Sequence, residues 1–534
     1  MSQEFDYIVV GGGSSGCVMA SRLSEDSSKR VLLIESGHRD SHPYIHIPST
    51  FFKVIDKGRD IVPYVGERDE GVNGRESVVL QGHVIGGGSS VNAMIYIRGH
   101  ANDYNQWAQL GNKGWSYEDV LPAFRDVENN MVFSDGFHGT DGELRVSEAP
   151  HKHPLSRAFV RAGQEVGLPY NPDFNGAEQE GVGFYQSTTH NGRRWSSAQA
   201  FLRKAEKRKN LTIMTQTRVG KILFDGKRAT GVALEDGRKL TAKGEIILCA
   251  GAIETPRLMQ LSGVGPAEHL REHGIEVVAD LPGVGSNYQD HMESTVQGET
   301  YEPISLYRED KGLKAVRHML RYLMTHTGLV ASNVVECGGF ADVSGAGQPD
   351  VQFHCIPFMA GWVDRDPIEA HGFQIAPCFL RPKSRGSVRL RSSNPKDKAL
   401  FDAASFRDTD DLEVLARGVL KAIDIMNAPA MQKFIKRRAL PEEGLENDMD
   451  ALRDYVRQTC KTVFHPSGTA KMGVESDKMS VVDNELRVRG LEGLRVADAS
   501  VMPTLVSGNT NAPVIMIAER CSRFITGKER VAVA

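Results

Sequence analysis

Three glycines near the start of the chain have the spacing that binds the phosphates of a dinucleotide. Gly11, Gly13 and Gly16 form the pattern G-x-G-x-x-G after an apolar run that is expected to be a strand. The first glycine of such a pattern permits a tight turn, the second lets a pyrophosphate approach the backbone, and the third lets a helix pack closely on the strand. Glu35 ends the next apolar run, at the place where an acid suits ribose hydroxyls and disfavours a 2′-phosphate. The loop therefore predicts a dinucleotide site, and taken alone it fits FAD and NAD equally.

Two more glycine-rich segments follow along the chain. Residues 82–92 hold too many glycines for the interior of a helix or a strand. Backbone of this kind is useful where it must lie flat against a ligand. The third segment, 251–265, reads Gly-Ala-Ile-Glu-Thr-Pro-Arg-Leu-Met-Gln-Leu-Ser-Gly-Val-Gly. An enzyme that bound NAD alone would leave both segments unexplained.

A histidine and a polar segment near the C-terminus carry groups suited to proton transfer and to anion binding. His465 stands beside a glycine turn, where a histidine is more often structural than catalytic when nothing else is known. A neutral imidazole can nevertheless accept a proton near pH 7. Residues 507–513 lead into an apolar helix expected over 514–525 and closed by Gly527, with Pro513 suited to its first turn. The N-terminal end of that helix would favour negative charge on a ligand.

Together these motifs resemble the glucose–methanol–choline oxidoreductase family, whose members oxidise alcohols with FAD. The second and third glycine-rich segments are similar to the two signatures of this family. They depart from them once, at His83, where the family usually has Arg, Lys, Asn or Cys. The resemblance extends from Phe5 to Thr526 and is nearest to bacterial aliphatic alcohol dehydrogenases and choline dehydrogenases.

The resemblance also implies a mechanism and a set of cofactor contacts. His465 would accept the proton of the substrate hydroxyl and Asn509 would hydrogen-bond the same oxygen, while the carbinol carbon passes a hydride to flavin N5. Some relatives attach FAD covalently through a histidine at the position that Val91 occupies here. Valine has no nucleophilic atom, so the resemblance implies FAD without a covalent link. No residue is assigned to a metal. The residues assigned to FAD are Gly11, Gly13, Ser14, Ser15, Gly16, Glu35, Ser36, Gly82, Val84, Gly86, Gly87, Ser89, Asn92, Ala93, Met94, Ile95, Val219, Ala250, Gly251, Asp498, Ala499, Asn511, Ala512 and Pro513.

Several reactions remain open within this family. We expect oxidation of a primary alcohol to the aldehyde, with electrons passed to a quinone or a dye-like acceptor. The alternatives are an oxidase that makes hydrogen peroxide from oxygen, a choline dehydrogenase and, more remotely, a lyase that keeps FAD as a structural part. A quaternary ammonium needs an aromatic cage and usually a carboxylate, and the sequence places no such cage. Apolar substrate walls are expected from Phe353, Phe358, Met359, Trp362 and Phe379.

These residues need a scaffold that brings distant segments together. The opening predicts a β-α-β unit, with strands over 6–10 and 31–35 and a helix over 15–24. Other strands are expected over 211–215, 221–224, 245–249, 351–356 and 387–390, and helices over 410–427 and 448–457. The predicted fold is α/β (α+β overall), a Rossmann-like FAD-binding domain with an inserted substrate-binding domain built on an antiparallel sheet with helices. We assign residues 1–153, 190–297 and 455–534 to the first domain and 154–189 and 298–454 to the second.

The composition argues against several other classes of protein. Of 534 residues, 40% are hydrophobic and 25% are charged, and 64 basic against 68 acidic residues give a net charge of −4. These values exclude a disordered or collagen-like chain, and the lack of a charged tail argues against a nucleic-acid partner. Seven scattered cysteines without a CxxC pair argue against disulfides and zinc, and predict small buried side chains. The apolar runs fall far short of the ~20 residues that span a bilayer, so we expect a cytoplasmic protein, at most peripheral on the inner membrane.

Overall fold

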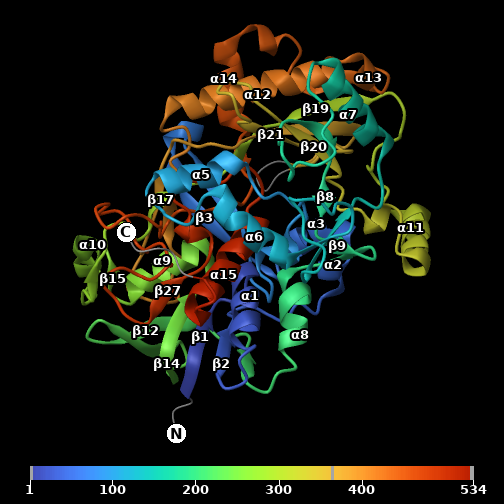
Figure 1. Ribbon diagram of the computed structural model, residues 1–534. Helices are drawn as coiled ribbons and strands as arrows, with labels where there is room; N and C mark the ends of the chain where they lie inside the picture. Colours follow the sequence, from blue (N-terminus) through green and yellow to red (C-terminus); the bar gives the residue numbers. More distant parts are fainter. Residues whose placement is uncertain (1–3, 362–365, 530–534) are drawn as a thin grey trace.

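The chain forms two large sheets, each with its own layer of helices (Figure 1). The computed structural model describes residues 4–361 and 366–529. In the first sheet, parallel strands run in the order β11-β2-β1-β14-β27, and β13 and β12 extend it beyond β14 as antiparallel strands. The strands of this sheet are β1 (Glu4–Val10), β2 (Val31–Ile34), β11 (Leu211–Met214), β12 (Val219–Asp225), β13 (Arg228–Leu234), β14 (Lys239–Leu248) and β27 (Leu494–Val496).

Two helices far apart in the sequence pack together at the first sheet. Helix α1 (Ser14–Leu23) lies on β1 and β2, and α15 (Asn511–Thr526) lies against α1. A Cβ atom on Gly16 would collide with the carbonyl oxygen of Gly11, so only glycine lets α1 approach β1 this closely. Helix α15 ends at Gly527, which has a φ of 71°. The predicted β-α-β unit and the predicted C-terminal helix are therefore both present.

The second sheet is antiparallel and carries its helices on one face. Its strands follow the order β25-β19-β22-β21-β20-β7, and the short strands β18 and β26 attach at one side. They are β7 (Gly181–Phe184), β18 (Met292–Glu293), β19 (Val296–Thr300), β20 (Cys337–Ala341), β21 (Val351–Ile356), β22 (Gly372–Phe379), β25 (Ile435–Leu440) and β26 (Lys461–Thr462). Helices α7 (Pro154–Glu165), α12 (Thr409–Asn427) and α14 (Met449–Thr459) form the layer at the top of Figure 1. The predicted fold class is confirmed, with an antiparallel sheet in the inserted part.

The segments assigned to the two predicted domains are closely connected. The boundaries predicted at 297 and 455 fall inside β19 and α14. Strand β23 (Gly386–Arg389), from the inserted part, pairs with β17 (Ser286–Tyr288) and with β24 (Leu400–Asp402). The division into two domains stays a prediction.

All seven cysteines are buried and free, as their scattered positions predicted. Burial raises the pKa of several of these thiols, those of Cys249 and Cys378 among them. Within residues 4–361 and 366–529, every helix is too short or too polar to cross a membrane.

Candidate active site

The first glycine loop lies between β1 and α1 and keeps one side open. Gly11 has a φ of +101° and its missing side chain makes room for the backbone of Cys249. A Cβ atom on Gly13 would meet no atom closer than 3.8 Å. The loop therefore offers backbone N–H groups and the N-terminal end of α1 to an approaching anion, which is what a pyrophosphate needs.

Glu35 holds this loop in place as well as facing the cavity beside it. Its Oε2 accepts from the N–H of Gly12 at 2.6 Å, and its Oε1 accepts from the N–H of Gly37 at 2.7 Å. Burial raises the pKa of Glu35, and the two amide donors limit the rise. The carboxylate therefore links the end of β2 to the glycine loop, a role that the sequence did not indicate.

The second glycine-rich segment packs directly on the first loop. The N–H of Gly86 donates to the carbonyl of Gly12 at 2.7 Å. A Cβ atom on Gly87 would lie only 2.7 Å from the Cα of Gly13. The glycines are required here for contact between two loops, in addition to any contact with a ligand.

Three polar side chains predicted to hold FAD are bonded to protein. The hydroxyl of Ser89 donates to the carbonyl of Gly86 at 2.6 Å, and Asn92 Oδ1 accepts from Arg194 at 2.7 Å. Asp498 Oδ2 accepts from the N–H of Gly251 at 2.8 Å, at the start of α9 (Gly251–Leu261). These atoms of the three side chains therefore stabilise the loops around the site.

A cavity lies beside the glycine loop, β2 and α9, and the unfilled space there is about 840 Å³ with open solvent included. The predicted residues that line it are Gly11, Gly13, Glu35, Ser36, Gly82, Val219 and Ala250. Sequence reasoning missed Tyr64, Gln81, Arg218 and Glu254, which also line it. Nothing in the pattern around Arg218 marks it, because an arginine after a strand is ordinary surface sequence. His83, the departure from the family signature, lines the cavity too, with Nε2 3.0 Å from Ser36 Oγ.

The C-terminal segment reaches the glycine loop from the other side. The hydroxyl of Ser14 donates to Asn511 Oδ1 at 2.9 Å, so the N-terminal ends of α1 and α15 adjoin. Two adjoining helix N-termini favour an anionic ligand more than one does. The other predicted cofactor residues are buried or half-buried around these loops: Ser15, Gly16, Val84, Ala93, Met94, Ile95, Ala499, Ala512 and Pro513. The open loop, the cavity and the paired helix ends fit a flavin dinucleotide.

The two predicted catalytic residues are neighbours. Asn509 Nδ2 lies 3.4 Å from His465 Nε2, and Asn509 Oδ1 accepts from Gln352 Nε2 at 3.2 Å. Gln352 therefore fixes the amide so that its NH₂ group faces the histidine. The structure places a hydrogen-bond donor and an imidazole nitrogen side by side.

His291, which sequence reasoning missed, determines the protonation of His465. The imidazole of His291 is fully buried, with Nε2 3.1 Å from the carbonyl of Leu380 and Nδ1 2.9 Å from His465 Nδ1. Burial lowers the pKa of His291 to about 3, so the ring is neutral and carries one proton. A carbonyl can only accept, so this proton is on Nε2, and His291 Nδ1 must accept the proton of His465 Nδ1. His465 Nε2 is left without a proton, and its lone pair faces Asn509 Nδ2 at 3.4 Å.

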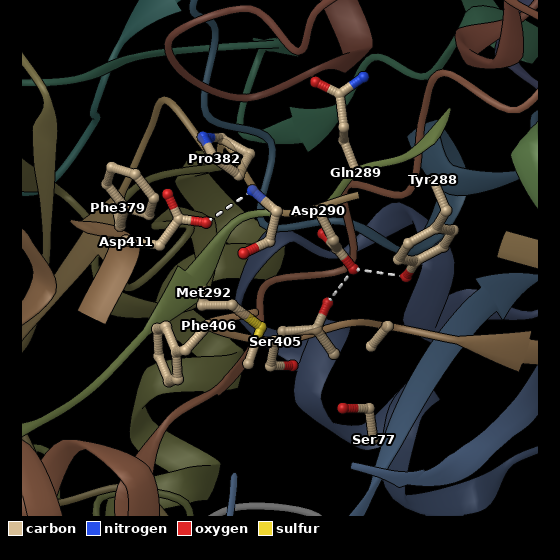
Figure 2. A pocket seen from close by; sticks show the side chains of 13 residues that line it. Ser77, Tyr288, Gln289, Asp290, Met292, Phe379, Pro382, Ser405, Phe406 and Asp411 are labelled. Carbon is tan, nitrogen blue, oxygen red and sulfur yellow. Dashed lines mark hydrogen bonds between the residues drawn. The ribbon is translucent and has the colours of Figure 1, made fainter. Parts of the chain in front are cut away.

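Asp290 accepts hydrogen bonds from the backbone of both histidines. Its Oδ1 accepts from the backbone N–H of His465 at 2.8 Å and of His291 at 2.9 Å. Its Oδ2 accepts from the hydroxyls of Thr462 at 2.5 Å and Tyr288 at 3.1 Å, and the Tyr288 contact is visible in Figure 2. Burial raises the pKa of Asp290 to about 6, although the four hydrogen bonds act to lower it. The small cavity of Figure 2 is lined by Asp290 and not by His465 or Asn509, so it lies outside the catalytic pair.

The expectation that Phe353 and Phe379 line the substrate site is wrong. Phe353 and Phe379 point into the core between the second sheet and α7 and α12. The opposite face of the same strands carries Gln352, His354 and Gln374. Successive side chains of a strand point to opposite faces, so the aromatic residues pack on the helix layer, and Gln352 on the other face reaches Asn509.

The other three expected wall residues differ in their surroundings. Phe358 is half-buried, with its ring 5.6 Å from that of Phe52. Met359 is buried against Gly372. Trp362 lies outside the described residues.

A buried carboxylate near His354 is already paired. Glu293 lies 3.0 Å from His354 Nδ1 and 3.0 Å from Lys461 Nζ. Burial opposes the ionisation of Glu293, but Lys461 and His354 outweigh it and hold the pKa below its usual value. The negative charge of this group is therefore balanced within the protein.

One group of possible metal ligands lies elsewhere in the described part of the chain, at Asp135, His138 and Asp173. Burial opposes protonation of His138, but hydrogen bonds to Asp173 and Glu128 raise its pKa to about 9. In the structure His138 joins Glu128 and Asp173 in a buried ion network.

Comparison with known proteins agrees with this geometry, which defines a flavin-dependent oxidoreductase. The chain belongs to the GMC oxidoreductase family, whose N-terminal model matches residues 5–293 and whose C-terminal model matches residues 382–518. It is 42% identical to the alcohol dehydrogenase [acceptor] of Pseudomonas putida over 98% of this chain and 96% of that one. It is 40% identical to the oxygen-dependent choline dehydrogenase of Brucella canis over 99% and 97%.

Solved structures show the same fold. Pyridoxine 4-oxidase from Mesorbium loti has a TM-score of 0.87 at 31% identity, covering 97% of this chain and 98% of that one. An FAD-dependent oxidoreductase from Chaetomium thermophilum has a TM-score of 0.90 at 28% identity, covering 99% and 100%. The predicted family and its cofactor FAD are confirmed. None of these relatives is a lyase, and that alternative is dropped.

Proposed function

We propose that the chain oxidises an uncharged primary alcohol to the aldehyde, with His465 as the base. The observation that carries this proposal is the pairing of His291 with His465, which leaves His465 Nε2 unprotonated and facing the amide of Asn509. Bound FAD supplies the acceptor for a hydride. The chain itself does the rest: His465 Nε2 removes the hydroxyl proton, and Asn509 Nδ2 donates to the same oxygen.

The cofactor site would hold FAD without a covalent bond. The glycine loop and the adjoining ends of α1 and α15 would bind the pyrophosphate, and Glu35 would bind the adenosine ribose. Val91 lies half-buried beside Val84 and Tyr44 and has no nucleophilic atom. These features support a dissociable flavin.

The charge near the catalytic pair favours a neutral substrate over choline. A quaternary ammonium is attracted by an unpaired carboxylate, and Glu293 is paired with two cationic or polar partners. Choline stays the alternative because a choline dehydrogenase is among the relatives at 40% identity.

We further propose that the electron acceptor is not oxygen but a quinone, for which a dye can substitute in an assay. The name of the relative from Pseudomonas putida supports this choice. A quinone acceptor would require the enzyme to contact a membrane, and we propose the cytoplasmic side of the inner membrane. The similarity to pyridoxine 4-oxidase favours the oxidase alternative, in which oxygen takes the electrons.

One experiment tests both parts of the proposal. Purified holoenzyme is mixed anaerobically with 1-alkanols, benzyl alcohol or choline, and flavin bleaching is followed; turnover is then compared with a phenazine dye and with oxygen alone. We expect bleaching by a neutral alcohol and faster turnover with the dye. Bleaching by choline alone would contradict the substrate class, and stoichiometric peroxide at comparable rates would make the enzyme an oxidase.

A further inference from the structure

Helix α11 (Gly312–Thr325) lies at the edge of the molecule (Figure 1). It carries an apolar stripe that faces solvent. Leu313, Val316, Leu320, Leu323 and Met324 are between 53% and 87% exposed. At about 100° per residue, these five side chains fall within one arc of roughly 100° on the helix surface. Soluble proteins rarely leave a continuous stripe of this kind uncovered.

The stripe has a basic edge and no acidic one. Arg317, Arg321 and Lys314 follow the stripe on one side, and α11 contains no Asp or Glu. Lys314 pairs with Glu309 at 2.6 Å, whereas Arg317 and Arg321 form no ion pair with any described residue. This local positive charge stands in a chain whose net charge is −4.

Only a small part of α11 is used for folding. Tyr322 is its one buried residue, and it contacts Val330 and Ala331 of the following turn, η4 (Leu329–Ala331). Met319 is half-buried in the same cluster. One narrow face of the helix thus packs against the rest of the protein, and the wider apolar face is exposed to solvent.

We propose that α11 docks the enzyme on an anionic phospholipid bilayer, lying in the plane of its surface. A helix with an apolar stripe and flanking Lys and Arg has the composition of an interfacial helix, and anionic headgroups complement its basic edge. A symmetric dimer through the stripe would bring Arg317 and Arg321 of two copies to one interface, which disfavours a second copy as the occupant.

The docked face is connected to the cofactor site. The chain after α11 returns to the residues that directly follow the second glycine-rich segment, where Asn333 Nδ2 donates to the carbonyl of Ala93 at 2.9 Å. Val335 packs in one apolar cluster with Met94 and Ile95. If the proposed function is correct, a lipid-dissolved quinone would reach the enzyme beside the segment that faces the flavin.

Vesicle sedimentation of the holoenzyme tests this docking. The probes are vesicles of phosphatidylglycerol with phosphatidylethanolamine, and vesicles of phosphatidylcholine alone. We expect the parent enzyme to sediment with the anionic vesicles and to be released by salt. The triple variant Leu313→Gln/Leu320→Gln/Met324→Gln and the double variant Arg317→Glu/Arg321→Glu should each bind at least tenfold more weakly.

A matched control removes exposed apolar side chains elsewhere. Leu110→Gln/Met131→Gln changes residues that are 49% and 53% exposed, and it should bind like the parent enzyme. Turnover of a soluble alcohol with a dye should be unchanged in all these variants, because none of the residues contacts the catalytic pair.

Three results would overturn the proposal: a parent enzyme that stays in the supernatant with anionic vesicles, a triple variant that binds like the parent, or a parent dimer that only the triple variant dissociates. The last result would show that a second copy covers the stripe. Vesicle binding without any alcohol turnover would leave the docking intact and refute the proposed function instead.

Discussion

His291 and His465 face each other Nδ1 to Nδ1 at 2.9 Å, and the carbonyl of Leu380 on the far side of His291 determines which ring donates. The proton between the two rings belongs to His465, so the opposite nitrogen of His465 has no proton. A base whose tautomer is fixed in advance does not have to rearrange when the substrate binds. His291 therefore acts as a positioning residue.

Replacing His291 should slow proton removal without loss of FAD. His291→Leu removes the acceptor for His465 Nδ1, and we expect flavin reduction by alcohol to fall roughly 10–10³-fold, as when an orienting partner is lost. His291→Gln keeps an acceptor oxygen and should recover much of the rate. Anaerobic stopped-flow absorbance of the flavin measures both variants. Equal losses in the two variants would mean that His291 only fills space.

The pH dependence of flavin reduction should rise below the usual range of histidine. Burial, with the imidazoles of His291 and His354, holds the pKa of His465 well below its ordinary value. The active form is the neutral one, so the rate increases as pH rises through this lowered pKa and is level above it. Stopped-flow rates from pH 5 to pH 9 should therefore be nearly constant above pH 6.5. A rise centred at or above pH 6.5 would contradict this environment for His465.

Asp290 should be needed for stability and for the placement of the base. Asp290→Ala leaves four donors without their acceptor: the N–H groups of His291 and His465 and the hydroxyls of Tyr288 and Thr462. We expect a loss of roughly 2–5 kcal/mol in the free energy of unfolding, together with slower flavin reduction. Asp290→Asn keeps one acceptor oxygen for the backbone N–H groups and should be milder on both measures. Thermal unfolding at a fixed scan rate compares the variants, and an Ala variant as stable as the Asn variant would refute this role.

The sequence predicted the parts of the site that local pattern determines. The loop at Gly11–Gly16, the strands around it and helix α15 follow from glycine spacing and apolar periodicity. His291 was missed because its role depends on a contact with a residue 174 positions away. Phe353 was misplaced because a strand with helices on one face and a binding site on the other has no solvent face to mark its direction. The pairing of Glu293 with His354 and Lys461 likewise exists only after folding.

The flavin should be released when the protein unfolds. Val91 stands where some relatives attach FAD, and a valine side chain cannot form that bond. Acid precipitation should leave free yellow FAD in the supernatant, measured by its absorbance and fluorescence. Flavin that sediments with the denatured chain would show a covalent link from another residue.

The mechanism depends most on His465 itself. His465→Ala removes the unprotonated nitrogen that faces the amide of Asn509, so flavin reduction by alcohol should fall roughly 10²–10⁴-fold. Bound FAD should be retained, because the glycine loop and the ends of α1 and α15 lie on other segments. Asn509→Ala should have a smaller effect, since it removes one hydrogen bond and leaves the base. Anaerobic stopped-flow with alcohol deuterated at the carbinol carbon reports the hydride step directly. If His465→Ala reduces its flavin at nearly the parental rate with full FAD, His465 is structural and another group removes the proton.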